Sequence, residues 1–389
     1  MPINESEKYA GIYCSYIQGN LEDTKAPSGY SPFYISHYTR HGSRYLLLEE
    51  DFQVVSEFEK YDAAGKLSDK GKALLADMKK LYGEHKRMFS FLTLKGGKQQ
   101  QDIAHRMARR FPAVFRKGGK IRCISSPAQR CIQSLANFTL SLSAEHNDLD
   151  FSIHSGHRYY DIIAPRLADS EYKKHYIQLR DSLILSDGIS QSAVKECFLA
   201  PDEIEVDWTS MTHDIYTLCC AMQCQDYEAP GMNTYFTTEQ LESLWRAENT
   251  YNYGVFCDTL TFGPYRRDNV GKPLLQDIIT QIDFALTSGD RVADLRFGHD
   301  SGLTPLLVLI GLEGYEKQLP LTEAWQTWRN YEKVCMASNV QIVFYRHRSK
   351  EILVKILRNE EEAYIPALKS EYGPYYSWNN LREYLIKLL

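Results

Sequence analysis

Strand-like and helix-like segments alternate at both ends of this 389-residue chain, and their order constrains the fold more than any other feature. A helix is predicted from residue 67, with Ser68 placed as its N-cap. A second helix is predicted to begin near Lys98 and to end before Pro112. Short segments with the apolar composition of strands lie at 31–38, 120–126 and 150–155. Alternation of this kind predicts an α/β sheet flanked by helices.

The C-terminal part of the chain repeats this pattern. A helix is predicted at 274–289, a strand running into a loop at 291–300, a short apolar helix at 303–312, and paired strands at 339–347 and 351–359. Residues 159–272 differ, because their pattern is mostly helical and rich in Tyr, Trp, Cys and acidic residues. We therefore expect a central mixed sheet flanked by helices. Residues 1–158 plus 273–389 would form this α/β core, and 159–272 a mostly α-helical insert.

Composition narrows the function classes. The net charge is −5, so the overall charge of the chain does not indicate a nucleic-acid-binding protein. No segment approaches the roughly 18 consecutive apolar residues that a membrane span requires. The first residues lack the basic start and apolar run of a signal peptide, which favours a cytoplasmic protein or a mature form. The irregular spacing of the cysteines is not a disulfide framework, and we expect Cys219, Cys220 and Cys224 to be buried thiols.

Polar motifs follow the predicted strands at the points where three of them end. The motifs occupy 38–44, 125–130 and 297–300 and read YTRHGSR, SSPAQR and FGHD. Ligands of open α/β sheets bind beyond the carboxyl ends of strands, so these motifs are candidates for one site. Each motif alone is also consistent with a surface loop or an ordinary helix start, and their combination carries the hypothesis.

The residue types of these motifs suit phosphoryl transfer. Arginine guanidiniums match phosphate oxygens in bidentate fashion. An imidazole can attack phosphorus and carry the phosphoryl group, and the arginines beside His41 favour its neutral form. The leaving alkoxide needs a proton, which an aspartic acid can supply before its carboxylate activates water. Gly42 allows the backbone to approach the phosphate closely.

The same motifs resemble those of the histidine acid phosphatases. RHGSR at 40–44 resembles their RHGxRxP signature, and FGHD resembles their His-Asp motif. The segment at 92–115 resembles their LTxxGxxQ helix, and the C-terminal half is similar to that of the multiple inositol polyphosphate phosphatases. Leu46 replaces the proline of the signature, and His-Asp stands where the animal inositol polyphosphate phosphatases usually have His-Ala-Glu. Positional preference on an inositol ring therefore cannot be carried over.

The resemblance implies a role for each matching residue. It makes His41 the nucleophile and Asp300 the proton donor, and it places the substrate cleft between the α/β core and the helical insert. It implies no metal or cofactor, a small phosphate ester as the binding partner, and an exported or periplasmic location. The residues that it assigns to phosphate binding are Arg40, Arg44, Arg130 and His299.

The expected activity is metal-independent hydrolysis of phosphomonoesters, including inositol polyphosphates such as phytate, through a phosphohistidine. A broad acid phosphatase or sugar-phosphate phosphatase is one alternative, and a non-catalytic phospholigand-binding protein on the same fold is another. Basic residues predominate between 95 and 130, and they form either a field that steers a polyanion or a solvated helix face. Arg266 or Arg267 is a weaker candidate for substrate contact, whereas His37 and His157 are expected to be structural.

Overall fold

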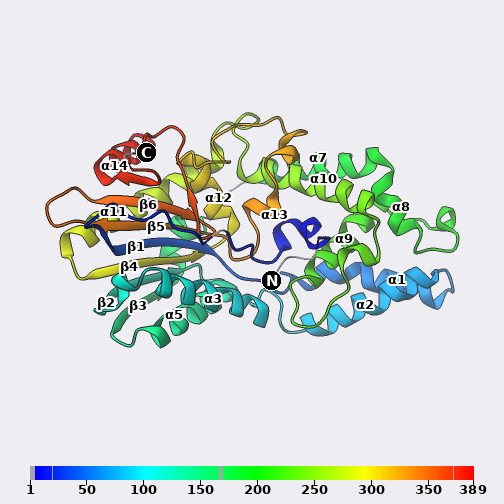
Figure 1. The fold of residues 1–389 in the computed structure, drawn as a ribbon. Helices are drawn as coiled ribbons and strands as arrows, with labels where there is room; N and C mark the ends of the chain where they lie inside the picture. Colours follow the sequence, from blue (N-terminus) through cyan, green and yellow to red (C-terminus); the bar gives the residue numbers. More distant parts are fainter. Residues whose placement is uncertain (1–4, 20, 166–169, 371) are drawn as a thin grey trace.

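One eight-stranded mixed sheet organises the molecule, which we describe from a computed structural model for residues 5–19, 21–165, 170–370 and 372–389. The strand order is β3-β2-β4-β1-β5-β6-β7, and β8 also pairs with β6 (Figure 1). Strands β1 to β4 run parallel, whereas β5 is antiparallel to β1, which confirms the expected mixed sheet. The strands are β1 (Ser31–Arg40), β2 (Gly119–Ser125), β3 (Leu149–Ser155), β4 (Arg291–Gly298), β5 (Asn339–Arg346), β6 (Leu353–Arg358), β7 (Glu361–Ala363) and β8 (Tyr375–Ser377).

The register of the parallel strands places their carboxyl ends side by side. Arg40 at the end of β1 lies beside Gly298 of β4, and Ser125 of β2 lies beside Phe297 of the same strand. The loops that follow these strands therefore leave the sheet at one level. This arrangement brings the three polar motifs of the sequence to one edge of the sheet.

Helices cover both faces of the sheet. Helices α3 (Leu94–Arg110), α4 (Pro112–Phe115) and α5 (Gln129–Glu145) pack on one face around a core that includes Phe138 and Leu295. Helices α11 (Lys272–Ser288), α12 (Asp300–Leu309) and α14 (Trp378–Lys387) pack on the other face, where the core includes Tyr38 and Leu303 (Figure 1). The parallel strands β1, β2 and β4 are thus mostly buried on both sides, whereas the edge strand β3 is largely exposed.

The remaining helices lie mostly beyond the carboxyl ends of the parallel strands (Figure 1). The described residues between 159 and 272 contain helices and no strand. Helices α1 and α2, which precede the proposed insert, share an apolar cluster with residues of α8, α9 and α10. The division at 158 and 273 stays a prediction. These helices are α1 (Gln53–Ala63), α2 (Asp69–His85), α6 (Tyr160–Ile163), α7 (Ser170–Asp187), α8 (Ile189–Lys195), α9 (Trp208–Met222) and α10 (Thr238–Phe256).

The start of α3 differs from the prediction. The hydroxyl of Ser68 caps α2 as expected, accepting a hydrogen bond from the backbone N–H of Gly71. Helix α3, however, begins at Leu94 rather than near Lys98, because the Thr93 hydroxyl accepts from the N–H of Gly96 at 3.1 Å. A Cβ atom at Gly42 would overlap the carbonyl of Gly96. Glycine at both positions therefore lets the first turn of α3 pack directly against the loop after β1.

A half-buried polar network joins three helices of the helical part. His213 of α9 contacts Glu248 of α10 with 2.9 Å between Nε2 and Oε1, and Arg180 of α7 reaches the same carboxylate at 3.4 Å. Burial alone would lower the pKa of His213, but Asp214 and Glu248 outweigh burial and raise the pKa to about 9. The network therefore holds a charged imidazole between the helices at neutral pH.

The described cysteines are all free and buried, which confirms the expectation for Cys219, Cys220 and Cys224. Among the described helices, none combines the length and hydrophobicity that crossing a lipid bilayer requires.

Candidate active site

The loop after β1 fixes the ring of His41. Its backbone N–H donates to the Gly298 carbonyl at 3.0 Å, and its carbonyl accepts from the N–H of Ala337 at 3.0 Å. The ring nitrogen Nδ1 lies 2.8 Å from the carbonyl oxygen of Gly42. Because a carbonyl only accepts hydrogen bonds, Nδ1 must carry a proton. In the neutral ring, Nε2 therefore keeps its lone pair.

The surroundings of His41 favour that neutral form. The residue is 2% exposed, and burial lowers the pKa of His41 well below its ordinary value. The guanidiniums of Arg130 and Arg40 lower the pKa further, since they repel a protonated ring. His41 is thus a neutral imidazole at neutral pH, with a proton on Nδ1 and a lone pair on Nε2.

Arg40 holds Asp300 rather than pointing freely into the pocket. One guanidinium nitrogen lies 2.9 Å from Asp300 Oδ2, and another donates to the carbonyls of Ile12 and Val334. Burial raises the pKa of Asp300, but the charge of Arg40 and the hydrogen bond from the Ser301 N–H lower it, so the pKa lies below its ordinary value. The carboxylate is therefore ionised before any anion enters the pocket.

His299 lies across the pocket from His41, with 5.6 Å between the ring centroids. Its Nδ1 is 3.4 Å from a guanidinium nitrogen of Arg130, which can only donate, so the proton of the neutral ring is on Nε2. That Nε2 lies 2.9 Å from the hydroxyl of Ser126. Burial lowers the pKa of His299 to about 3, helped by Arg130. His299 is thus a neutral imidazole.

Arg44 and Arg130 complete the cationic side of the pocket. Arg44 donates to the carbonyl of Tyr45 at 3.0 Å, and its guanidinium lies 5.2 Å from the centre of the Tyr13 ring. Arg130 donates to the Ser90 hydroxyl at 2.8 Å. These contacts orient both guanidiniums, which lowers the entropy lost when they bind an anion.

All the residues predicted for the site line one cavity of about 600 Å³. Its other wall is formed by residues of the helical part, and these include Lys173 of α7, Tyr251 of α10 and Arg266. Arg266 thus lies at the cavity as suggested, and Arg267 is not among the lining residues. Lys173, Tyr251 and the carbonyl of Ile12 were not predicted, since no local motif marks them. The chemical roles of the lining residues stay predictions.

The other candidates lie elsewhere. His37 is 1% exposed and packs against Phe138 and Phe297 in the core. His157 is exposed and packs edge-to-face against Tyr160, with 4.8 Å between ring centroids. Within the described ranges, no group of His, Cys, Asp or Glu residues is arranged to hold a metal ion.

The basic run between 95 and 130 is mostly neutralised. Arg106 pairs with Glu360 at 2.7 Å, Arg110 with Asp23 at 2.5 Å, and Arg122 with Asp277 at 3.1 Å. Of the basic residues in this run, Arg130 alone lines the cavity described above. The geometry therefore gives no support to a steering field along this segment.

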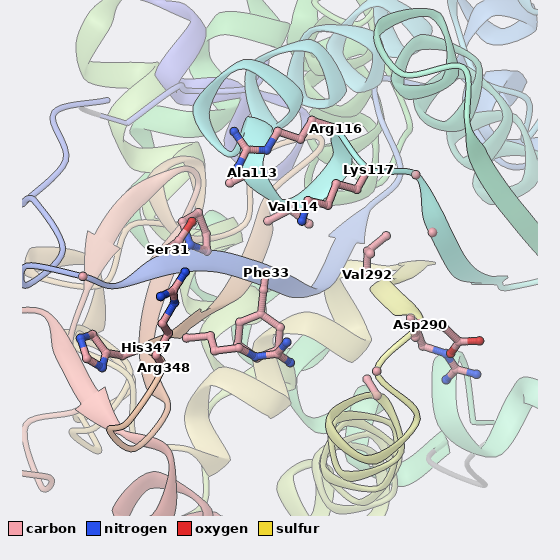
Figure 2. Close-up of a pocket in the computed structure, with 18 residues that line it drawn as sticks. Ser31, Phe33, Ala113, Val114, Arg116, Lys117, Asp290, Val292, His347 and Arg348 are labelled. Atoms are coloured by element: carbon pink, nitrogen blue, oxygen red, sulfur yellow. The ribbon is translucent and has the colours of Figure 1, made fainter.

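A second hollow, of about 670 Å³, lies at the opposite ends of the parallel strands (Figure 2). Arg116, Lys117 and Arg348 are among its lining residues, together with Phe33 and Asp290. None of the predicted site residues lines this hollow. The residues predicted from the motifs therefore line the cavity at the carboxyl ends of the strands and not this second hollow.

An α/β sheet that presents a neutral imidazole among guanidiniums beside a carboxylate is the arrangement of an enzyme that handles phosphate esters. The chain belongs to the histidine phosphatase superfamily (branch 2), whose family model matches residues 38–359. Members of this family are phosphomonoesterases, and the resemblance seen in the motifs is thereby confirmed.

Individual relatives are distant in sequence and similar in fold. Multiple inositol polyphosphate phosphatase 1 of Gallus gallus is 21% identical over 367 residues, which cover 87% of this chain and 78% of the relative. The multiple inositol polyphosphate phosphatase of Bifidobacterium longum, in complex with inositol hexasulfate, superposes with a TM-score of 0.78 at 18% identity and 97% coverage of both chains. The phytase of D. castellii gives a TM-score of 0.75 at 14% identity, covering 98% of this chain and 85% of the phytase.

Proposed function

We propose that this phosphomonoesterase works through a covalent phosphohistidine on His41 and hydrolyses inositol polyphosphates such as phytate. The observation that carries the proposal is the position of His41 Nε2. Nδ1 is bound to the Gly42 carbonyl at 2.8 Å, so the free lone pair faces a cavity lined by guanidiniums. A phosphoryl group held by those guanidiniums would present its phosphorus to this nitrogen.

In the first step, the Nε2 lone pair attacks phosphorus and the bond from phosphorus to the ester oxygen breaks. Arg44 and Arg130 neutralise the charge on the equatorial oxygens, and His299 donates an N–H to one of these oxygens, which can only accept. The leaving oxygen takes its proton from Asp300. Entry of the phosphate anion beside Arg40 offsets the positive field on Asp300, which raises the pKa of Asp300 and favours its protonated form.

In the second step, water attacks the phosphohistidine. The bond between phosphorus and Nε2 breaks, and the lone pair returns to the imidazole of His41. The Asp300 carboxylate, left ionised by the first step, takes the proton from the water. Inorganic phosphate is released and Asp300 is protonated again, as it was in the complex with the substrate; this proton was taken from solvent when the phosphate entered and returns there when the phosphate leaves.

The preference for several phosphates is supported by cations on both walls of the cavity. Beyond the residues around the reacting phosphate, Lys173 and Arg266 line the wall formed by the helical part. The guanidinium of Arg266 lies 5.5 Å from the centre of the Tyr172 ring, which orients it. A substrate with a second phosphate would contact both groups of cations at once, whereas a simple monoester would contact one.

Two measurements test this proposal. His41→Ala should abolish turnover and should not retain radioactive phosphate from a labelled substrate after an alkaline quench. His157→Ala is a matched control, because His157 is exposed and outside the cavity. Full activity of His41→Ala would end the mechanism.

Substrate preference is tested separately, by comparing kcat/KM for phytate and glucose 1-phosphate. A clear preference for phytate is expected. Equal values, or a preference for glucose 1-phosphate, would favour the alternative of a broad acid or sugar-phosphate phosphatase.

A further inference from the structure

One hydroxyl group forms two hydrogen bonds with the backbone of the loop between β4 and α12. The hydroxyl of Tyr38 on β1 accepts a hydrogen bond from the N–H of His299 at 3.2 Å and lies 3.3 Å from the carbonyl oxygen of the same residue, to which it donates. Tyr38 is 1% exposed. A single side chain from the strand that carries the nucleophile thus fastens both polar groups of one residue in the loop opposite.

Two glycines make room for this hydroxyl. A Cβ atom at Gly298 or at Gly302 would overlap the Tyr38 oxygen. Both glycines have negative φ, so their backbone angles do not demand glycine. The space that they leave is filled by the phenol, which indicates that the loop and the tyrosine fit each other specifically.

We infer that Tyr38 is a positioning residue. Through the backbone of His299, it fixes the positions of two groups of the proposed site: the proton donor Asp300 and the phosphate ligand His299. The inference rests on the proposed function. His299 is the N-cap of α12 and Asp300 is its first residue, so a rotation at His299 turns the imidazole and the carboxyl together. Strand β1 ends at Arg40, directly before the proposed nucleophile His41. The same strand therefore positions His41 and, through Tyr38, the loop between β4 and α12 on the other side of the pocket. Small displacements at such sites lower rates strongly.

Tyr38→Phe tests this inference, because it removes the hydroxyl and keeps the ring. For glycerol 2-phosphate, whose leaving group needs a proton, kcat/KM should fall about tenfold to a hundredfold. For p-nitrophenyl phosphate, whose leaving group departs without one, the fall should be below about fivefold. A loss of packing or stability alone would lower both values by the same factor.

Tyr34→Phe is the matched control. Tyr34 lies on the same strand, is 0% exposed and donates its hydroxyl to Asp294 of β4 at 2.8 Å, away from the loop. It should leave the ratio of the two kcat/KM values unchanged. Thermal unfolding of both variants shows whether the two lost hydroxyls affect stability alike.

Gly302→Ala gives a second, independent test. Its methyl group would displace the Tyr38 oxygen, so kcat/KM for glycerol 2-phosphate should fall in the wild-type background. With Phe at position 38 the oxygen is gone and Cζ is 3.2 Å from the added Cβ, so the further loss should be smaller.

The outcomes separate the two proposals. Equal effects of Tyr38→Phe on both substrates, no effect on either, or fully additive losses with Gly302→Ala would overturn the role of Tyr38. They would leave the phosphohistidine mechanism standing as long as wild-type turnover depends on His41. Turnover that survives His41→Ala would instead overturn the proposed function itself.

Discussion

The guanidinium of Arg40 lies 2.9 Å from the carboxylate of Asp300, although both residues were predicted to face a bound phosphate. Arg40 is 1% exposed and is also held by two backbone carbonyls. Without a ligand, the guanidinium of Arg40 is therefore paired with the Asp300 carboxylate. A phosphate that enters the pocket would compete with this carboxylate for the guanidinium. In the proposed mechanism, this contact would link phosphate binding to the protonation of Asp300.

Asp300→Asn should slow substrates according to their leaving groups, because it removes the proposed proton donor and preserves the shape of the side chain. We expect kcat/KM to fall about a hundredfold or more for glycerol 2-phosphate and much less for p-nitrophenyl phosphate. Steady-state kinetics with both substrates check this. Equal losses would show that Asp300 is not the acid.

Arg130→Ala should move the acid limb of the pH profile to higher pH. Burial is the main reason that the pKa of His41 is low, and Arg130 is the largest contribution from a charge. Removing that charge makes protonation easier, so the pKa of His41 rises and the neutral nucleophile is lost at a less acidic pH. The profile of kcat/KM against pH measures the shift. An acid limb that stays in place, with only the overall rate reduced, would contradict the electrostatic account.

Lys173→Ala should raise KM for phytate by about fivefold to tenfold and leave kcat/KM for p-nitrophenyl phosphate nearly unchanged. The reason is that Lys173 lines the far wall of the cavity, away from the reacting phosphate. Lys174→Ala, at the next position of α7 and outside the cavity lining, is the control. A loss shared by both substrates would argue against a second phosphate contact.

His213→Gln should destabilise the protein in a pH-dependent way. Because the pKa of His213 is raised to about 9 in the fold, its stabilising contribution is fully present below the ordinary value near 6.5. The contribution is lost as pH rises through about 9. We expect the variant to lose about 1–3 kcal/mol of unfolding free energy at pH 6 and little above pH 9.5. Denaturant titrations at both pH values measure this, and a loss that does not vary with pH would contradict a charged imidazole.

Much of the sheet and of the site could be predicted because the signals are local. The apolar segments before Arg40, Ser126 and His299 mark strands, and the polar motifs follow each of them at once. Parallel pairing of β1, β2 and β4 then brings the motifs together. The start of α3 was misplaced because two glycines weakened the helical pattern, whereas the Thr93 cap decides the boundary.

The opposite wall could not be predicted, since it depends on long-range packing. Nothing near Lys173 or Tyr251 in the sequence indicates that α7 and α10 meet above the strand ends. The segment Glu7–Tyr13 likewise gives no sign that the carbonyl of Ile12 binds Arg40. The double hydrogen bond of Tyr38 joins residues that are 261 positions apart.

The two walls of the cavity come from different parts of the chain and are held by different contacts. The strand-end residues are fixed by the sheet, whereas Lys173 and Tyr251 are carried by helices that pack among themselves. A substitution on α7 or α10 would therefore change the wall that faces the strand-end residues and leave the sheet contacts that hold His41 in place. In the proposed enzyme, substrate preference and bond cleavage would thus be separable by mutation.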